Sequence, residues 1–189
     1  MGRALVIVLL VVGLLSGCSH TSVRDEWMNP SYQGPPVHSV LVLCLPADSK
    51  EKECEDDFVT KFAKRGIAAT PGYSTAALSA SRASAMAKAR EMGVPRLLVS
   101  RFVKQQTVIE AYPIDSADLM WPEYDMWMDY EYVQSDYLVF ATILYDTATG
   151  KTIWAAESET LERPSERKNM MSYVKAMVWK MEHQRLVAR

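Results

Sequence analysis

The spacing of hydrophobic residues changes along the chain, and it first predicts a strand followed by a helix. Residues 37–45 are almost continuously apolar and rich in valine, which is typical of a strand buried on both faces. Cys54, Phe58 and Phe62 then follow at intervals of four residues. This interval places the three side chains on one face of a helix, which we expect to end at Gly66.

The pattern continues as an alternation of strands and helices. A short strand, an alanine-rich helix and a long strand are predicted at residues 67–70, 79–92 and 96–109. Because two helices separate three strands, we expect the strands to be parallel and joined by crossovers. A central strand, a five-residue turn and a partner strand follow at residues 133–145, 146–150 and 151–157.

The C-terminal segment predicts a helix that starts at Pro164 and carries one apolar stripe. The stripe consists of Met170, Val174, Met177, Val178 and Met181. The sequence therefore predicts an α/β fold. It has a mixed sheet of three parallel strands followed by an antiparallel hairpin, with packed helices that include the C-terminal one.

The N-terminus has the parts of a secretory signal peptide, namely Arg3, an apolar run over residues 4–15 and small residues before Cys18. The run is too short for a spanning helix, which needs roughly 20 residues. Leu15-Ser16-Gly17-Cys18 resembles the lipobox of bacterial lipoproteins. The resemblance implies that residues 1–17 are removed and that Cys18 is lipidated, which would anchor the chain in a membrane. An uncleaved N-terminal anchor is the alternative.

Two further expectations concern the region after Cys18. In lipoproteins of this kind an Asp after the Cys often marks retention at the inner membrane, so Ser19 favours the periplasmic face of the outer membrane. Residues 18–36 are polar and contain prolines, so they predict a tether that ends in an extended segment. Trp27 and Tyr32 are expected to hold this segment on a single α/β domain formed by residues 37–189.

Two cysteines remain for the folded part of the chain. Cys44 lies at the end of a predicted strand, and Cys54 lies near the start of the next helix. In an oxidising compartment the two can form a disulfide if their Cα atoms come within about 7 Å. Two buried free thiols are the alternative. No Cys-x-x-Cys motif or nearby His supports a zinc site, so we expect no metal and no cofactor.

The segment 110–136 differs in composition from the rest of the chain. It contains eight acidic residues and no Lys or Arg, interleaved with aromatic residues and methionines. Because aromatic residues and Met are enriched at the centres of protein interfaces, we interpret residues 110–132 as an insertion that docks another envelope protein. The alternative is an insertion that folds back over an edge of the sheet. The candidate contact residues are Tyr112, Trp121, Tyr124, Trp127 and Tyr130.

Composition and motifs argue against several other functions. The formal net charge of −2 argues against nucleic-acid binding. None of the three histidines has a Ser or Cys nucleophile beside it in the sequence, and no glycine-rich phosphate loop is present. The acidic residues match no calcium loop, and no Met-x-x-Met pair favours copper(I). We therefore expect a protein without catalytic activity.

Two aromatic motifs resemble those of a family of uncharacterised bacterial lipoproteins. They are Trp27-x-x-Pro30-x-Tyr32-x-Gly34-Pro35-Pro36 and Tyr145-Asp146-x-x-Thr149-Gly150-Lys151-x-x-Trp154-x-x-x-Ser158-Glu159-Thr160. The resemblance implies a fold similar to the amino-terminal domain of TolB and to the periplasmic domain of the curli-secretion lipoprotein. A likeness of fold does not by itself specify a function.

Residues and resemblance together lead to one expected function. We expect a non-catalytic lipoprotein of the outer membrane that serves as a protein-docking module in envelope assembly or maintenance. The alternative is a lipoprotein that binds a small molecule or a metal ion through residues 110–136.

Overall fold

The computed structural model describes residues 20–45, 49–75, 81–113 and 130–187. Within them one sheet has six strands in the order β1-β6-β5-β4-β2-β3. The strands are β1 (Thr21–Met28), β2 (Ser39–Leu45), β3 (Ala68–Pro71), β4 (Arg96–Pro113), β5 (Tyr130–Asp146) and β6 (Thr152–Leu161). The helices are α2 (Ser49–Ala63), the short 3₁₀ helix η2 (Gly72–Ser74), α3 (Arg82–Glu91) and α4 (Glu166–His183).

The expected α/β fold is confirmed by the strand pairing. β2 pairs in parallel with both β3 and β4, which gives the three parallel strands. β4 pairs with β5, and β5 with β6, in antiparallel fashion. The predicted turn at residues 146–150 joins β5 to β6, and Gly150 has a φ of +72°, a conformation that glycine adopts without strain.

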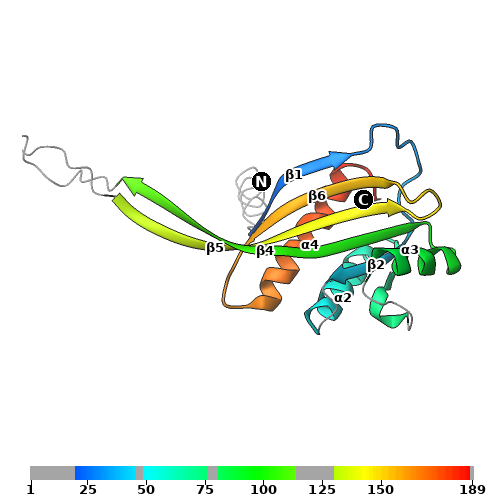
Figure 1. The fold of residues 1–189 in the computed structure, drawn as a ribbon, viewed down its shortest axis with the longest axis horizontal. Helices are drawn as coiled ribbons and strands as arrows, with labels where there is room; N and C mark the ends of the chain where they lie inside the picture. The colour runs from blue at the N-terminus through cyan, green and yellow to red at the C-terminus, as the bar shows by residue number, and fades with distance from the viewer. Residues whose placement is uncertain (1–19, 46–48, 76–80, 114–129, 188–189) are drawn as a thin grey trace, which may run out of the picture.

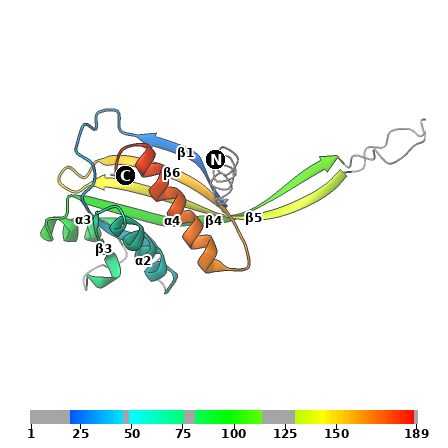
Figure 2. The same cartoon turned by 180° about the vertical axis from the view of Figure 1, so that it is seen from behind.

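The helices form a layer on each face of the sheet (Figures 1 and 2). α2 and α4 lie side by side on one face, where Phe58, Phe62, Tyr173 and Met177 form the main core with Trp154 of β6. α3 covers part of the opposite face through a smaller core. The predicted faces of α2 and α4 are therefore the buried ones, although Met170, the first residue of the apolar face of α4, is only partly buried.

The expected tether is wrong for residues 21–28, because they form the edge strand β1. β1 pairs antiparallel with β6 from Thr21 opposite Thr160 to Met28 opposite Trp154. An edge strand is held by backbone hydrogen bonds to one neighbour, so it needs little of the apolar alternation that identifies inner strands. Val23 and Met28 pack against the core, and the charged residues between them hid the strand in the sequence.

Of the two side chains expected to hold the extended segment, Tyr32 does so and Trp27 does not. The Tyr32 ring packs against the main core, and its hydroxyl accepts a hydrogen bond from the Arg96 guanidinium at 3.0 Å. Trp27 is about half exposed. The domain therefore starts at β1 and includes Tyr32.

A disulfide joins Cys44 and Cys54, whose Cα atoms are 6.3 Å apart. It connects the end of β2 to the buried face of α2, and both residues are buried. Beside it, the buried Glu55 carboxylate accepts hydrogen bonds from the backbone N–H groups of Cys44 and Tyr73 at 3.0 and 2.9 Å. Burial raises the pKa of Glu55, and these two hydrogen bonds oppose the rise. The cluster fixes η2 and the end of β2 to the helix.

Candidate functional site

β4 and β5 extend beyond every other described strand, and Figure 1 shows them as a two-stranded ribbon that leaves the body of the domain. β2 pairs with β4 only as far as Arg101, and β6 pairs with β5 only from Tyr137 onward. Residues 107–113 of β4 and 130–136 of β5 therefore pair only with each other among the described strands. We call these residues the β-arm. At about 3.3 Å per residue, the β-arm extends roughly 25 Å.

One face of the β-arm is apolar at its far end, whereas Gln134 and the Thr107–Asp136 pair lie on the same face nearer the body. Side chains of a strand alternate between faces, and directly paired residues share a face. Ile109, Ala111 and Pro113 of β4 therefore lie on the same face as Tyr132 and Tyr130, with which Ala111 and Pro113 pair. Ile109 is 64% exposed and Tyr132 is 70% exposed. We call this the apolar face.

The other face combines carboxylates with apolar side chains. Glu110 pairs with Val133, and Tyr112 pairs with Glu131. The Tyr112 hydroxyl donates a hydrogen bond to the Glu110 carboxylate, as expected for neighbours two residues apart on one face. This hydrogen bond and the carboxylate's charge raise the pKa of Tyr112. We call this the acidic face, and it also includes Val108 by alternation.

The β-arm is negatively charged as a whole. Its residues include Glu110, Glu131 and Asp136, and no Lys or Arg. Asp136 accepts a hydrogen bond from the Thr107 hydroxyl at 2.6 Å across the two strands. The two glutamates on the acidic face have no cation within ion-pair distance among the described residues. The β-arm therefore presents uncompensated negative charge beside exposed apolar side chains.

The β-arm leaves large apolar side chains exposed. A two-stranded hairpin alone is marginally stable in water, because two strands without a covering layer bury little apolar surface. Large exposed apolar surfaces in soluble proteins mark interaction sites. The body of the sheet, in contrast, buries both faces of the same two strands. The β-arm is accordingly the described part of the chain best suited to binding.

Tyr173 of α4 connects β4 and β5 in the body of the sheet. Tyr173 of α4 is fully buried, and its hydroxyl is hydrogen-bonded to Ser100 of β4 and to Thr142 of β5, which pair directly. Burial raises the pKa of Tyr173 to about 12, although these hydrogen bonds oppose the rise. The Phe140 ring stacks on the Tyr173 ring at 4.3 Å between centroids. One helix residue thus ties β4 to β5 within the body, next to the point where β4 loses its pairing with β2.

The structure describes only part of the predicted site. Tyr112 and Tyr130 lie at the far end of the β-arm, on its acidic and apolar faces respectively. Trp121, Tyr124 and Trp127 lie outside the described residues, as does Cys18. The predicted insertion at 110–132 is wrong at both ends, because residues 110–113 and 130–132 continue β4 and β5. For the same reason these residues do not fold back over an edge of the sheet.

The sequence prediction does not place Ile109, Tyr132 and Val133 on an exposed ribbon. It puts Ile109 at the end of a long strand and Val133 at the start of a central strand covered on both faces. The signal that could have placed them is the matching length of the two segments. β4 has 18 residues and β5 has 17, whereas the neighbouring β6 has 10. Their outer halves therefore had no third strand to pair with.

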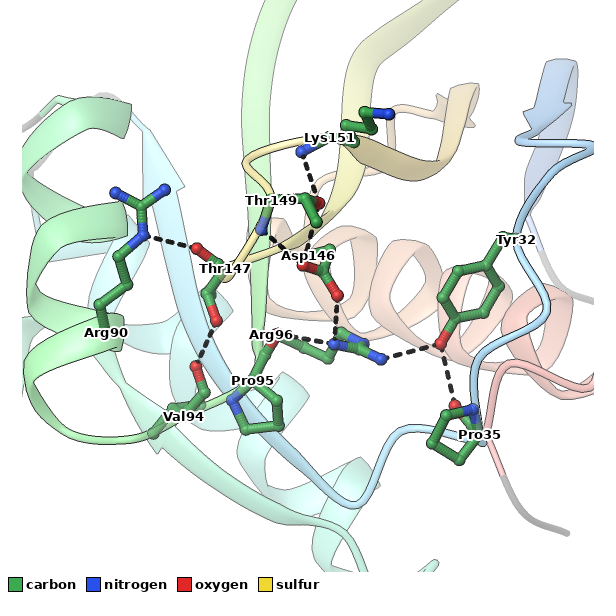
Figure 3. A network of polar contacts seen from close by, with 10 residues as sticks. All are labelled: Tyr32, Pro35, Arg90, Val94, Pro95, Arg96, Asp146, Thr147, Thr149 and Lys151. Atoms are coloured by element: carbon green, nitrogen blue, oxygen red, sulfur yellow. Dashed lines mark hydrogen bonds and ion pairs between the residues drawn. The ribbon is translucent and has the colours of Figure 1, made fainter.

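The opposite end of the sheet carries a network of polar contacts, shown in Figure 3. The Arg96 guanidinium donates to Asp146 at 2.7 Å and to the Tyr32 hydroxyl, which in turn donates to the Pro35 carbonyl. Burial alone would raise the pKa of Asp146. Hydrogen bonds from Thr149 and the charge of Arg96 outweigh this effect, so the pKa is lowered. These contacts fix the β5–β6 turn to the segment after β1.

The described residues also bear on metal binding and on membrane-spanning helices. The described residues contain no group of three or more His, Cys, Asp or Glu side chains placed to hold a metal ion. No helix in the described part of the chain is long and apolar enough to cross a membrane.

Comparisons with known proteins show a shared fold but no family. No family model matches the sequence, and no curated protein matches it. Two crystal forms of the PelC dodecamer from Paraburkholderia phytofirmans match with 15% identity and TM-scores of 0.51 and 0.50, over 89% of this chain and 99% of PelC. Lipoprotein GNA1162 from Neisseria meningitidis matches with 14% identity and a TM-score of 0.44, over 78% of this chain and 99% of GNA1162. TolB from Acinetobacter baumannii matches with 12% identity and a TM-score of 0.40, over 88% of this chain and 31% of TolB. The chain therefore has a fold similar to that of PelC.

Proposed function

We propose that this chain is a non-catalytic, lipid-anchored docking module of the bacterial envelope, and that the β-arm binds another envelope protein. The observation that carries the proposal is the exposed apolar face of a ribbon that leaves the body of the domain. Ile109 and Tyr132 anchor this face, because large exposed side chains contribute most of the binding energy at interfaces.

The position of His20, the first described residue, supports the proposed anchoring. The His20 carbonyl accepts a hydrogen bond from the Leu161 N–H at 2.9 Å, and Leu161 pairs with Tyr137 at the base of the β-arm. Cys18 precedes His20 by two residues, so it can lie no more than about 7 Å of chain away. A lipid on Cys18 would therefore hold the base of the β-arm close to the membrane surface. In this proposal that surface is the periplasmic face of the outer membrane.

The polar clusters of the body support a structural role for the body. Glu55, Arg96, Asp146 and Tyr173 all make hydrogen bonds that connect one element of the fold to another. PelC, whose fold is similar, is a dodecamer. A domain of this architecture can thus serve within a larger assembly. In this proposal the β-arm is the part that binds, and the body supports it.

Site-specific photo-crosslinking in intact cells tests the proposal. A photoreactive phenylalanine analogue would replace Tyr132 on the apolar face or, as a control, Tyr73 on η2. The two tyrosines are 70% and 46% exposed, but Tyr73 belongs to the body. We expect a discrete adduct with another envelope protein at position 132 and none at position 73.

A second arm of the same experiment checks specificity. Ile109→Ser, on the same face, should reduce the adduct formed at position 132 without changing the amount of the protein in the membrane. Equal adducts at positions 132 and 73, or no adduct at position 132, would show that the apolar face is not a docking surface.

A further inference from the structure

α4 carries a stripe of exposed side chains, one of which, Trp179, packs its ring against that of His183 at 3.7 Å between centroids. Opposite its buried side, Lys168, Met171, Lys175 and Trp179 follow at intervals of three, four and four residues, which places them along one line of the helix. Met171 is 44% exposed and Trp179 is 49% exposed. We call these four residues the α4 stripe. In Figure 2, α4 crosses the body on the side of the sheet that it shares with α2.

The two lysines of the α4 stripe differ from the other cations nearby. Arg167 forms an ion pair with Asp57, and Lys180 forms one with Glu26. Within the described residues, no carboxylate lies within ion-pair distance of Lys168 or Lys175. The stripe therefore presents two uncompensated positive charges beside a methionine and a tryptophan, two residue types that are enriched at the centres of interfaces.

The acidic face of the β-arm is complementary to the α4 stripe in both charge and spacing. Glu110 and Glu131 lie diagonally across the ribbon, two positions apart along the strands, so their Cβ atoms are about 8 Å apart. Lys168 and Lys175 are separated by seven residues of helix, which corresponds to about 10 Å. Flexible side chains easily span the difference.

We propose that the acidic face of the β-arm of one copy binds the α4 stripe of a second copy. Glu110 and Glu131 would pair with Lys168 and Lys175, while Tyr112 and Val133 would cover Met171 and Trp179. This inference rests on the proposed function in one respect, namely that the β-arm is a binding element. It adds a second copy of the chain as the partner of the acidic face.

The contact must form between copies, because the β-arm leaves the body while α4 is packed on it (Figure 2). In both views the β-arm extends away from the body on which its own α4 is packed (Figures 1 and 2). Two different surfaces then meet in a head-to-tail manner, so repeated contacts generate a closed ring or an open filament. The apolar face stays available for the other envelope protein, since it lies on the opposite side of the ribbon.

The test uses the full chain in membranes, with the photoreactive analogue at Tyr112 on the acidic face. We expect an adduct of twice the chain's mass, in which mass spectrometry finds position 112 joined to a peptide from residues 168–179. The double substitution Lys168→Glu, Lys175→Glu places like charges together and should lower the yield about ten-fold or more. Its charge-matched control, Lys64→Glu with Lys151→Glu, should leave the yield unchanged, because both lysines are exposed and lie outside the stripe.

Exchanging the charges on both surfaces separates a loss of the contact from misfolding of the lysine variant. Adding Glu110→Lys and Glu131→Lys to the reversed stripe should restore the adduct to within about three-fold of the unmodified chain. Adducts at position 112 with another protein only would overturn the second copy as partner and leave the docking function intact. Absence of adducts at both positions 112 and 132 would overturn the inference and the docking function together.

Discussion

The inner and outer halves of β4 and β5 have the same pairing but opposite surroundings. In the body, Leu97 and Leu98 are fully buried, because helices cover both faces of the sheet. In the β-arm, Ile109 and Tyr132 are among the most exposed large side chains described. The comparison shows that one continuous pair of strands can provide stability at one end and binding surface at the other. Substitutions should therefore separate the two properties.

The largest expected effect comes from removing core volume in the body. Trp154 of β6 is fully buried, and its indole N–H donates to Glu26 at 2.9 Å. Trp154→Ala would leave a cavity and remove one of the hydrogen bonds to Glu26, so we expect it to lower the free energy of unfolding by about 3–5 kcal/mol. Urea unfolding followed by circular dichroism would measure the change. A loss below about 1 kcal/mol would mean that the β6 core does not stabilise the domain.

An intermediate effect is expected at the end of the body opposite the β-arm. The lowered pKa of Asp146 means that its ionised form stabilises the fold. This contribution is present above the ordinary aspartate pKa of 3.8 and is lost as the pH falls below that value. Asp146→Asn should therefore lower stability at pH 7, by about 1–3 kcal/mol because Arg96 loses a buried partner.

The pH dependence provides the check on Asp146. Between pH 5 and pH 3, approximately the range in which aspartates titrate, the unmodified chain should lose more stability than Asp146→Asn. Parallel losses in the two proteins would show that the Asp146 carboxylate does not stabilise the network of Figure 3.

The smallest expected effect on stability comes from the β-arm. Ile109→Ser and Tyr132→Ser remove exposed side chains that contact no other layer of the fold. Each should change the free energy of unfolding by no more than about 0.5 kcal/mol. A loss of 2 kcal/mol or more, measured by the same urea unfolding, would mean that the β-arm packs against its own chain.

The sequence predicted the body better than the β-arm, for a physical reason. The spacing of apolar residues indicates which side chains are buried, so the apolar faces of α2, with Phe58 and Phe62, and of α4, with Met177, are predicted correctly. β1 was missed because an edge strand needs only backbone pairing. The continuation of β4 beyond Ile109 and the start of β5 before Val133 are not predicted, because exposed strands do not show a buried face.

Other features could not follow from sequence at all. The acidic and aromatic composition of residues 110–136 pointed to the region of the site, and Tyr112 and Tyr130 do lie on the β-arm. However, the division of the β-arm into an apolar and an acidic face depends on the register of β4 with β5. The role of Tyr173 in holding both strands likewise depends on how α4 packs on the sheet.

Hydrogen exchange along β4 is the measurement that compares its two halves most directly. In the dilute purified protein, amides of residues 97–101 should exchange at least about 100-fold more slowly than those of residues 107–111, because only the inner half lies between helix layers. In membranes that retain the bound partner, residues 107–111 should become protected while residues 97–101 stay unchanged. Equal protection of both halves in the isolated protein, or no gain at residues 107–111 in membranes, would contradict the conclusion that the β-arm is an open docking element on a stable body.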